Sequence, residues 1–206
     1  MKHILWDWNG TLLDDTQAAV GALNAMLERR GAKPITTAFY RDNFAFPVRP
    51  FYEKIGIKLE REDWDALARE YHALYAAQPK RLNREAIAAL EAVRAAGARQ
   101  SIISALRQDL LEEATAAFGV APYMERVCGT DNLDGASKLD RARDLVGQIA
   151  GAEAVVIGDA LHDKEVADAL KVGCVLCGQG SHAAWRLAAA APTGETLTEA
   201  VRLALA

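Results

Sequence analysis

Short apolar runs alternate with longer amphipathic stretches along the chain after residue 84. Four runs have the length and composition of buried strands, the second being the weakest: 101–103, 126–128, 154–157 and 172–176. The stretches between them have helical spacing, and the expected helices are 84–96, 108–118, 137–149, 164–170 and 182–190. This alternation predicts an α/β fold in three layers, a parallel sheet with helices on both faces. Right-handed crossovers then bring all the strand C-terminal ends to one edge.

The first strand lies at the N-terminus and ends in a carboxylate. The chain opens MKHILWDWNGTLLD, in which an apolar run at 4–6 is followed by Asp7, and Gly10 marks a turn. Ligands of parallel α/β sheets bind outside the carboxyl ends of the strands. An Asp placed there can act as a nucleophile toward phosphorus, so Asp7 is the first candidate catalytic residue.

The segment 16–83 has a different pattern. It contains helical stretches at 18–30 and 63–77 with no convincing strand between them, and glycine and proline punctuate it. We therefore expect an α/β core made of 1–15 and 84–206. A small helical domain, 16–83, is inserted after the first strand and could close over the site.

Composition and charge narrow the partners and the compartment. The formal charge of −4 gives no reason to expect nucleic acid or an anionic membrane as a partner. Charges interrupt every apolar segment before it reaches the length of a bilayer span, so we expect a cytoplasmic protein without membrane contact. Cys174 and Cys177 have the CxxC spacing, but no second pair completes a zinc site. We interpret them as small apolar residues of a buried strand.

Four polar features stand near strand ends or helix starts. They are the segment 7–11, Ser104 after the strand 101–103, Lys138 near a helix start, and the acidic segment 158–163. Each alone has a structural explanation, because strand-end Asp and Ser residues often cap the next helix and an isolated lysine is usually a surface residue. All four in this order indicate one site at the edge of the sheet.

With these features the chain resembles the haloacid dehalogenase-like hydrolase superfamily. The motifs of that superfamily are DxDGT, a strand-end Ser or Thr, a Lys and a GDxxxD-type acidic pair. The resemblance covers essentially the whole chain, which looks most like the phosphoglycolate-phosphatase-like branch and a subgroup that starts DWNGTLLDD. It implies a Rossmann-like core with a small α-helical cap. It also implies a Mg²⁺-dependent phosphatase that acts on a small phosphorylated metabolite through an aspartyl-phosphate.

The residue types suit this chemistry. Asp7 can attack phosphorus, but a carboxylate repels a phosphate dianion, so a cation must lie between them. Asp7, the backbone carbonyl of Asn9 and Asp159 supply the hard oxygen ligands that Mg²⁺ prefers. Asp163 would hold ligand waters or orient Lys138.

Phosphoryl oxygens also need hydrogen-bond donors and positive charge. Ser104 can donate a hydrogen bond to such an oxygen, and Lys138 can place a charge beside it. The remaining candidates for substrate binding are Gly10, Thr11, Ala105 and Arg49. Arg49 ends an aromatic-rich cap segment, 43–49, for which contact with a small anionic substrate and packing in the cap core are both open. For the loop 178–182 two roles are also open, contact with phosphate and capping of the next helix through Ser181.

Asn9 departs from the family pattern. In the family's phosphatases this residue is an Asp that protonates the leaving group and then activates water, which a neutral amide cannot do. Loss of a positioned general acid costs about 10²–10⁴ in rate, and an Asn9→Asp variant is expected to regain up to that factor on alkyl phosphates. Asn9 indicates a slower phosphatase, or one that cleaves esters with good leaving groups, or one in which His162 supplies the proton; an exposed loop histidine is an equally good interpretation of His162.

Two other functions stay open. Asn9 also fits a pseudoenzyme that binds a phosphorylated ligand or partner without turnover, although the intact nucleophile and acidic pair argue against it. A phosphotransferase or a phosphonate-cleaving relative is the other alternative. The latter needs a cap lysine for a Schiff base, and the candidates are Lys33, Lys54 and Lys58, whose surroundings resemble no such motif.

Overall fold

The computed structural model describes residues 1–130, 138–149 and 151–206. In this part of the chain a six-stranded sheet has the order β5-β4-β1-β6-β7-β8, and each neighbouring pair is parallel. The strands in this order are Val127–Thr130, Arg99–Arg107, Lys2–Trp6, Glu153–Gly158, Gly173–Cys177 and Thr193–Gly194. The predicted parallel α/β sheet of Rossmann-like type is confirmed.

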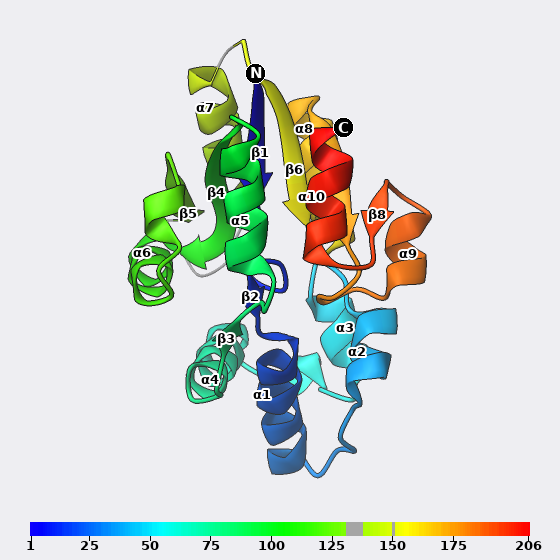
Figure 1. The fold of residues 1–206 in the computed structure, drawn as a ribbon. Coiled ribbons are helices and arrows are strands. Elements are labelled where there is room, and N and C mark those ends of the chain that lie inside the picture. The colour runs from blue at the N-terminus through cyan, green and yellow to red at the C-terminus, as the bar shows by residue number, and fades with distance from the viewer. Residues whose placement is uncertain (131–137, 150) are drawn as a thin grey trace.

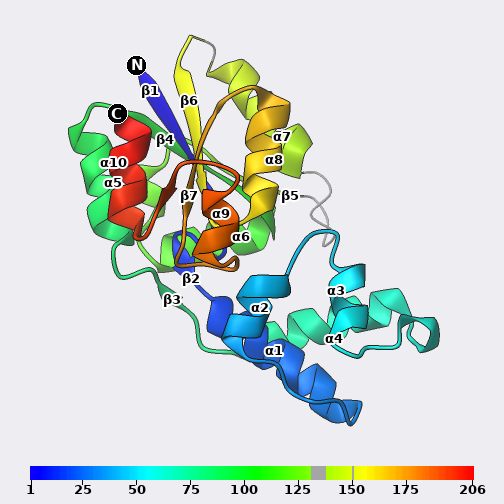
Figure 2. The same cartoon turned by 90° about the vertical axis from the view of Figure 1, so that its right-hand side faces the viewer.

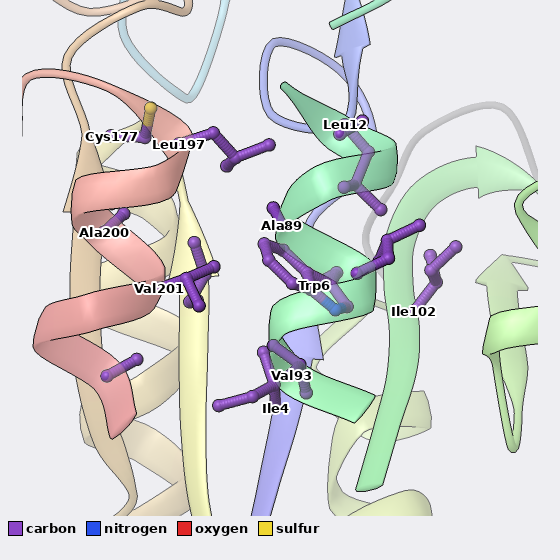
Figure 3. Packing of buried hydrophobic residues seen from close by; sticks show 14 of the residues in the cluster. Ile4, Trp6, Leu12, Ala89, Val93, Ile102, Cys177, Leu197, Ala200 and Val201 are labelled. Atoms are coloured by element: carbon purple, nitrogen blue, oxygen red, sulfur yellow. The ribbon is translucent and has the colours of Figure 1, made fainter. Parts of the chain in front are cut away.

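Helices cover both faces of the sheet (Figure 2). The helices α5 (Ala86–Ala95) and α10 (Leu197–Leu205) pack on one face, while α7 (Lys138–Gln148) and α8 (Leu161–Leu170) pack on the other. Successive side chains of β1 point to opposite faces. Trp6 therefore belongs to the core cluster beneath α5 and α10, and Leu5 belongs to the cluster beneath α7 and α8. Figure 3 shows Trp6 beside Ala89 and Val93 of α5. Along the edge, α6 (Gln108–Ala117) packs near β4 and β5, and the 3₁₀ turn η2 (Ala121–Tyr123) packs near α5 and α6.

The inserted segment is a helical cap with its own core. Its elements are α1 (Thr16–Arg29), α2 (Thr37–Asn43), α3 (Arg49–Lys54), the 3₁₀ turn η1 (Leu59–Arg61) and α4 (Trp64–Ala76). Met26, Leu27 and Leu67 are at most 1% exposed inside it. Figure 1 shows β1 and β6 pointing toward these helices, so the cap lies at the edge where the strand C-terminal ends meet.

A short two-stranded neck joins the cap to the core. β2 (Leu13–Asp14) pairs antiparallel with β3 (Arg81–Leu82), and Asn83 donates its backbone N–H to the carbonyl of Leu12 (2.8 Å). Neither β2 nor β3 is among the strands that the sequence predicts. A two-residue strand is too short to show alternation, and it forms here because its partner is brought beside it.

Several element boundaries also differ from the predicted ones. α8 begins at Leu161 rather than 164, and α9 (Ala184–Ala188) is shorter than the expected helix 182–190. β8 and α10 follow residue 190, where no element is predicted. α10 nevertheless has local signals: the Thr196 hydroxyl accepts the N–H of Glu199, and its buried positions follow helical spacing, Leu197, Ala200, Val201 and Ala204. Within the described ranges, no helix has the length and hydrophobicity needed to cross a bilayer.

The three cysteines have free thiols. Burial raises the pKa of both Cys174 and Cys177 to about 12, so these thiols stay protonated and unreactive at neutral pH. Cys177 belongs to the core cluster that also contains Leu197 (Figure 3). The geometry agrees with their interpretation as packing residues.

Candidate active site

Three buried aspartates meet at the C-terminal edge of the sheet. Each of Asp7, Asp159 and Asp163 offers a carboxylate oxygen, and these oxygens lie within 4.8 Å of one another. The register explains the meeting: Trp6 pairs with Ile157 across β1 and β6, and the N–H of Asp7 extends the ladder to the Ile157 carbonyl (2.8 Å). Asp159 follows the end of β6, and Asp163 lies in the first turn of α8.

Local hydrogen bonds hold Asp163 in this cluster. Its Oδ2 accepts the N–H groups of Asp159 (3.1 Å) and Ala160 (3.0 Å), which are donors left free at the start of α8. Gly158 leaves the space that this carboxylate occupies, because a Cβ there would lie 2.2 Å from the Asp163 side chain. The sequence GDALHD therefore folds into a strand end that places both carboxylates on one side.

Asp159 is fixed by donors from two other loops. The Thr11 hydroxyl donates to its Oδ1 (3.1 Å), and the N–H of Ser181 donates to its Oδ2 (2.5 Å). A Cβ on Gly10, whose φ is +79°, or on Gly180 would lie 2.3 Å from an oxygen of Asp159, so only glycine fits at either position. Thr11 is a predicted substrate-binding residue, and in the structure its buried hydroxyl supports this carboxylate.

The electrostatics of the cluster call for a cation. Burial, together with the nearby charge of Asp163, raises the pKa of Asp159 to about 7. Packed carboxylates repel one another, and a divalent cation among their oxygens would remove that repulsion. Hard oxygen donors of this kind fit Mg²⁺ rather than zinc. The residues present therefore fit the metal that the sequence predicts.

The other predicted catalytic residues lie at the same edge as far as the structure describes them. Trp6 pairs with Ile102 of β4, so Ser104, which is 2% exposed, lies two residues further along the neighbouring strand, at the same edge of the sheet as Asp7. The Ser104 Oγ accepts the N–H of Leu106 (3.1 Å). The carbonyl of Ala105 accepts the hydroxyl of Thr130 (3.0 Å). Lys138 begins α7, and its side chain lies outside the described residues.

Asn9 points its amide nitrogen at an acidic partner. Its Nδ2 donates to Asp15 Oδ2 (2.7 Å) and to the hydroxyl oxygen of Tyr75 (3.0 Å). The N–H of Gly10, another predicted substrate-binding group, donates to Asp15 Oδ1 (2.7 Å). Burial raises the pKa of Asp15, while the hydrogen bonds from Tyr75, Asn9 and Gly10 act in the opposite direction.

The cap residues divide into packing residues and one exposed aromatic. Tyr40 and Phe51 are buried in the cap core, where they pack against other cap residues. Arg49 is exposed, and its guanidinium lies 4.2 Å from the centre of the Trp64 ring within the cap. Phe46 is 48% exposed and lines a cavity of about 60 Å³ between cap and core. Within this segment, Phe46 is therefore the better candidate for facing a ligand.

His162 lies on the other side of the same small cavity. Its ring is 5.2 Å from the ring of Phe46, and its Nδ1 is 3.1 Å from the carboxylate of Glu165. Among the described residues, we find no hydrogen bond or ring contact that joins His162 to Asp7 or Asn9. Asp163, the next residue, turns into the cluster instead. The role of His162 as a proton donor stays a prediction.

Hydrogen bonds in both directions tie the cap to the loop after β7. The guanidinium of Arg41, in α2, donates to the carbonyls of Gln179 (2.7 Å) and Gly180 (2.8 Å). In return, the N–H of Ala183 (3.0 Å) and the guanidinium of Arg186 (2.8 Å) donate to the Arg41 carbonyl. We call these four bonds the clasp.

The loop after β7, which takes part in the clasp, also contacts the aspartate cluster. Ser181 is the residue that holds Asp159 through its N–H, and the N-cap of α9 is Ala183. The prediction that Ser181 caps the next helix is therefore wrong, because the loop runs two residues further before the helix begins. His182 is buried, burial lowers its pKa to about 4, and its Nδ1 accepts the N–H of Leu161 (3.1 Å). A neutral imidazole thus anchors the start of α8.

Arg41→Ala is expected to loosen the clasp. The variant loses two bonds from a charged donor, each with a net contribution of about 1.5–3 kcal/mol, so local opening should become at least about tenfold more frequent. Hydrogen exchange of the Ser181 and Ala183 amides measures that opening. Arg61→Ala is the control, because this cap side chain is 72% exposed. Unchanged exchange at both amides would show that other contacts hold the loop.

Sequence reasoning missed two side chains that the structure places at the site, Asp15 and Tyr75. It left the roles of Arg41 and of the Ser181 loop open between substrate contact and structure, and it did not foresee their bonds to Gln179 and Asp159. Asp15 had a signal, since it stands next to the turn after the first strand. Tyr75 had none, because it lies in a helix of the cap and reaches its partners only through the packing of cap on core.

The comparisons with known proteins agree with this geometry. The family model described as haloacid dehalogenase-like hydrolase matches residues 4–177. A phosphoglycolate phosphatase of Caulobacter vibrioides is 27% identical over 175 residues, covering 78% of this chain and 72% of that protein.

Solved structures repeat the whole fold. A predicted phosphatase from Clostridium acetobutylicum superposes with a TM-score of 0.79 at 17% identity, covering 99% of this chain and 98% of that one. Protein tyrosine kinase A of Mycobacterium tuberculosis superposes with a TM-score of 0.78 at 22% identity, covering 98% and 97%. The chain belongs to the haloacid dehalogenase-like hydrolase family, and it is a hydrolase with the fold of that family's phosphatases.

Proposed function

We propose that this protein is a Mg²⁺-dependent phosphatase that hydrolyses a small phosphorylated metabolite through an aspartyl-phosphate on Asp7. The observation that carries the proposal is the cluster of three buried carboxylates at the strand ends, with the cap at the same edge. A cluster of carboxylates at such a site can bind a cation, and the cation can in turn bind a phosphate. The residues Asp7, Asp159 and the carbonyl of Asn9 would hold Mg²⁺, with Asp163 behind them.

The chain's own groups divide the reaction into two displacements. Asp7 attacks phosphorus, and the bond between phosphorus and the ester oxygen breaks as the leaving group departs with the electron pair. Water then attacks the phosphoryl group, and the bond to Asp7 breaks, which restores the carboxylate and releases inorganic phosphate. Bound Mg²⁺ supplies neutralisation of the charge between Asp7 and the phosphoryl oxygens. Ser104 and Lys138 are the proposed contacts to those oxygens.

The substrate proposal follows from the named relative. The Caulobacter vibrioides protein is a phosphoglycolate phosphatase, so 2-phosphoglycolate is the first compound to test. We further place this chain in the subgroup that starts DWNGTLLDD. A panel of phosphorylated metabolites with Mg²⁺ tests the function: release of inorganic phosphate from at least one of them is expected. Metabolites that bind without any phosphate release would instead favour the pseudoenzyme, the function that Asn9 keeps in consideration.

Turnover is expected to depend strongly on the leaving group. Asn9 cannot protonate a departing oxygen, so aryl and acyl phosphates, which leave without a proton, should react faster than alkyl phosphates. The difference is expected to reach roughly 10²-fold or more in kcat/KM, the typical contribution of a general acid. Steady-state rates for matched aryl and alkyl phosphates at one pH measure it.

A second variant separates the sources of the proton. His162→Ala is expected to leave the ratio between aryl and alkyl substrates unchanged. Equal rates for the two classes in the natural protein, with a collapse of alkyl-phosphate turnover in His162→Ala, would mean that His162 supplies the proton.

A further inference from the structure

Asp15 is a buried carboxylate with three donors and no part in the chemistry proposed above. It is 5% exposed. Its Oδ1 accepts the N–H of Gly10 (2.7 Å), and its Oδ2 accepts Asn9 Nδ2 (2.7 Å) and the Tyr75 hydroxyl (2.5 Å). A buried acceptor with this many donors is a specific arrangement, because a lost partner would leave a charge without compensation.

The donor count fixes the orientation of Asn9. An asparagine amide has two N–H hydrogens, and here both are used, one on Asp15 and one on the Tyr75 oxygen (3.0 Å). The single hydroxyl hydrogen of Tyr75 goes to Asp15. A flipped amide would press the Asn9 oxygen against the carboxylate. As held, the side chain of Asn9 has only the lone pairs of its Oδ1 left for any further group.

The three residues come from three parts of the fold. Asn9 lies in the loop after β1, Asp15 lies between the neck strand β2 and α1, and Tyr75 lies in the last turns of α4 in the cap. The hydrogen-bond set is therefore complete only with the cap in the position that the structure shows.

We propose that Asp15 and Tyr75 are positioning residues for Asn9, and that Asp15 determines why residue 9 is an amide rather than an acid. They hold Asn9 so that it offers only an acceptor, its Oδ1, to the substrate or to the attacking water. This inference rests on the proposed function for its kinetic consequences. The pairing itself stands on the distances between the three side chains.

The proposal changes what an acid at residue 9 is expected to do. An Asn9→Asp substitution alone would put two buried carboxylates in the place of one hydrogen bond, and like charges at that distance disfavour each other. The single variant is therefore expected to gain little on alkyl phosphates, in contrast to the expectation from the sequence. The double variant Asn9→Asp/Asp15→Asn reverses the pair, because the amide at residue 15 can donate to the carboxylate at residue 9.

A double-substitution cycle tests the pairing. Asn9→Asp, Asp15→Asn and their combination are compared with the natural protein by turnover of an alkyl phosphate and by urea unfolding, both with Mg²⁺. The double variant is expected to exceed each single variant roughly tenfold or more in kcat, within the range of a restored general acid. It is also expected to unfold at a higher urea concentration than Asn9→Asp. A single Asn9→Asp variant as fast and as stable as the double would overturn the proposal.

Tyr75 is tested against its neighbour on the same helix. Tyr75→Phe removes the hydroxyl that contacts Asn9 and Asp15, and kcat for an aryl phosphate is expected to fall about fivefold or more with little change in KM. Tyr71→Phe is the control, because Tyr71 stacks on Tyr75 (5.9 Å between ring centres) without a hydrogen bond to Asn9 in the described contacts. Equal kinetics of the two variants would overturn the role of Tyr75.

The proposed function and the pairing of residues 9 and 15 would be contradicted by different results. If neither the natural protein nor any variant releases phosphate from any substrate, the proposed function fails. The urea cycle still decides the pairing in that case. A coupling between residues 9 and 15 supports it, and additive effects overturn it.

Discussion

Asp7→Asn is expected to lower phosphatase turnover by roughly 10⁴-fold or more, the scale seen when a covalent nucleophile is removed. An amide does not attack phosphorus, so the substitution removes the proposed nucleophile from the end of β1, where Asp7 is 7% exposed. The measurement is the release of inorganic phosphate from an aryl phosphate with Mg²⁺. The mass of the intact protein after rapid quenching should also show one phosphoryl group on the natural protein and none on the variant.

Asp14→Asn is the matched control for this change. Asp14 lies in the neck strand β2, where its carboxylate pairs with the exposed Arg81 (2.8 Å). The same chemical change seven residues along the chain should leave turnover within about twofold, because exposed ion pairs contribute little. Turnover retained by Asp7→Asn, or lost equally in both variants, would contradict the role of Asp7 as nucleophile.

Asp159→Asn is expected to lower Mg²⁺-dependent turnover by roughly 10³-fold and to stabilise the metal-free protein. In the folded protein the pKa of this carboxyl is raised from 3.8 to about 7, by burial and by Asp163. The folded state therefore binds this proton more tightly than the unfolded chain, and the free energy of unfolding falls as pH rises from about 4 to about 7. Above about pH 7 the whole cost of the buried charge is present, and the amide avoids it.

Urea unfolding with chelator at pH 5 and pH 8 measures the predicted change. The Asp159 carboxyl should make the free energy of unfolding of the metal-free natural protein higher at pH 5 than at pH 8. Asp159→Asn should reduce that difference. Added Mg²⁺ should stabilise the natural protein at pH 8 and not the variant. Asp65→Asn, an exposed aspartate of α4, is the control. An unchanged pH dependence in Asp159→Asn would contradict the electrostatic account of the cluster.

The sequence by itself determined the sheet and the positions of the chemistry along it. The apolar runs at 4–6, 101–103, 154–157 and 172–176 are strands in the structure, because buried strands of a parallel sheet are apolar on both faces. Asp7 and Asp159 follow two of those runs, so parallel pairing was enough to place them at one edge. The four motifs together also identified the family that the comparison with known families shows.

Only the tertiary structure decided which groups surround those residues. Asn9 is read from the sequence as a missing acid, while the fold pairs it with Asp15 and with Tyr75, 66 residues away. Arg41 meets Gly180 across 139 residues. Local periodicity carries no information about such contacts, because they depend on how the neck sets the cap against the sheet. The short strand β3 has the same origin, since its two residues become a strand only beside β2.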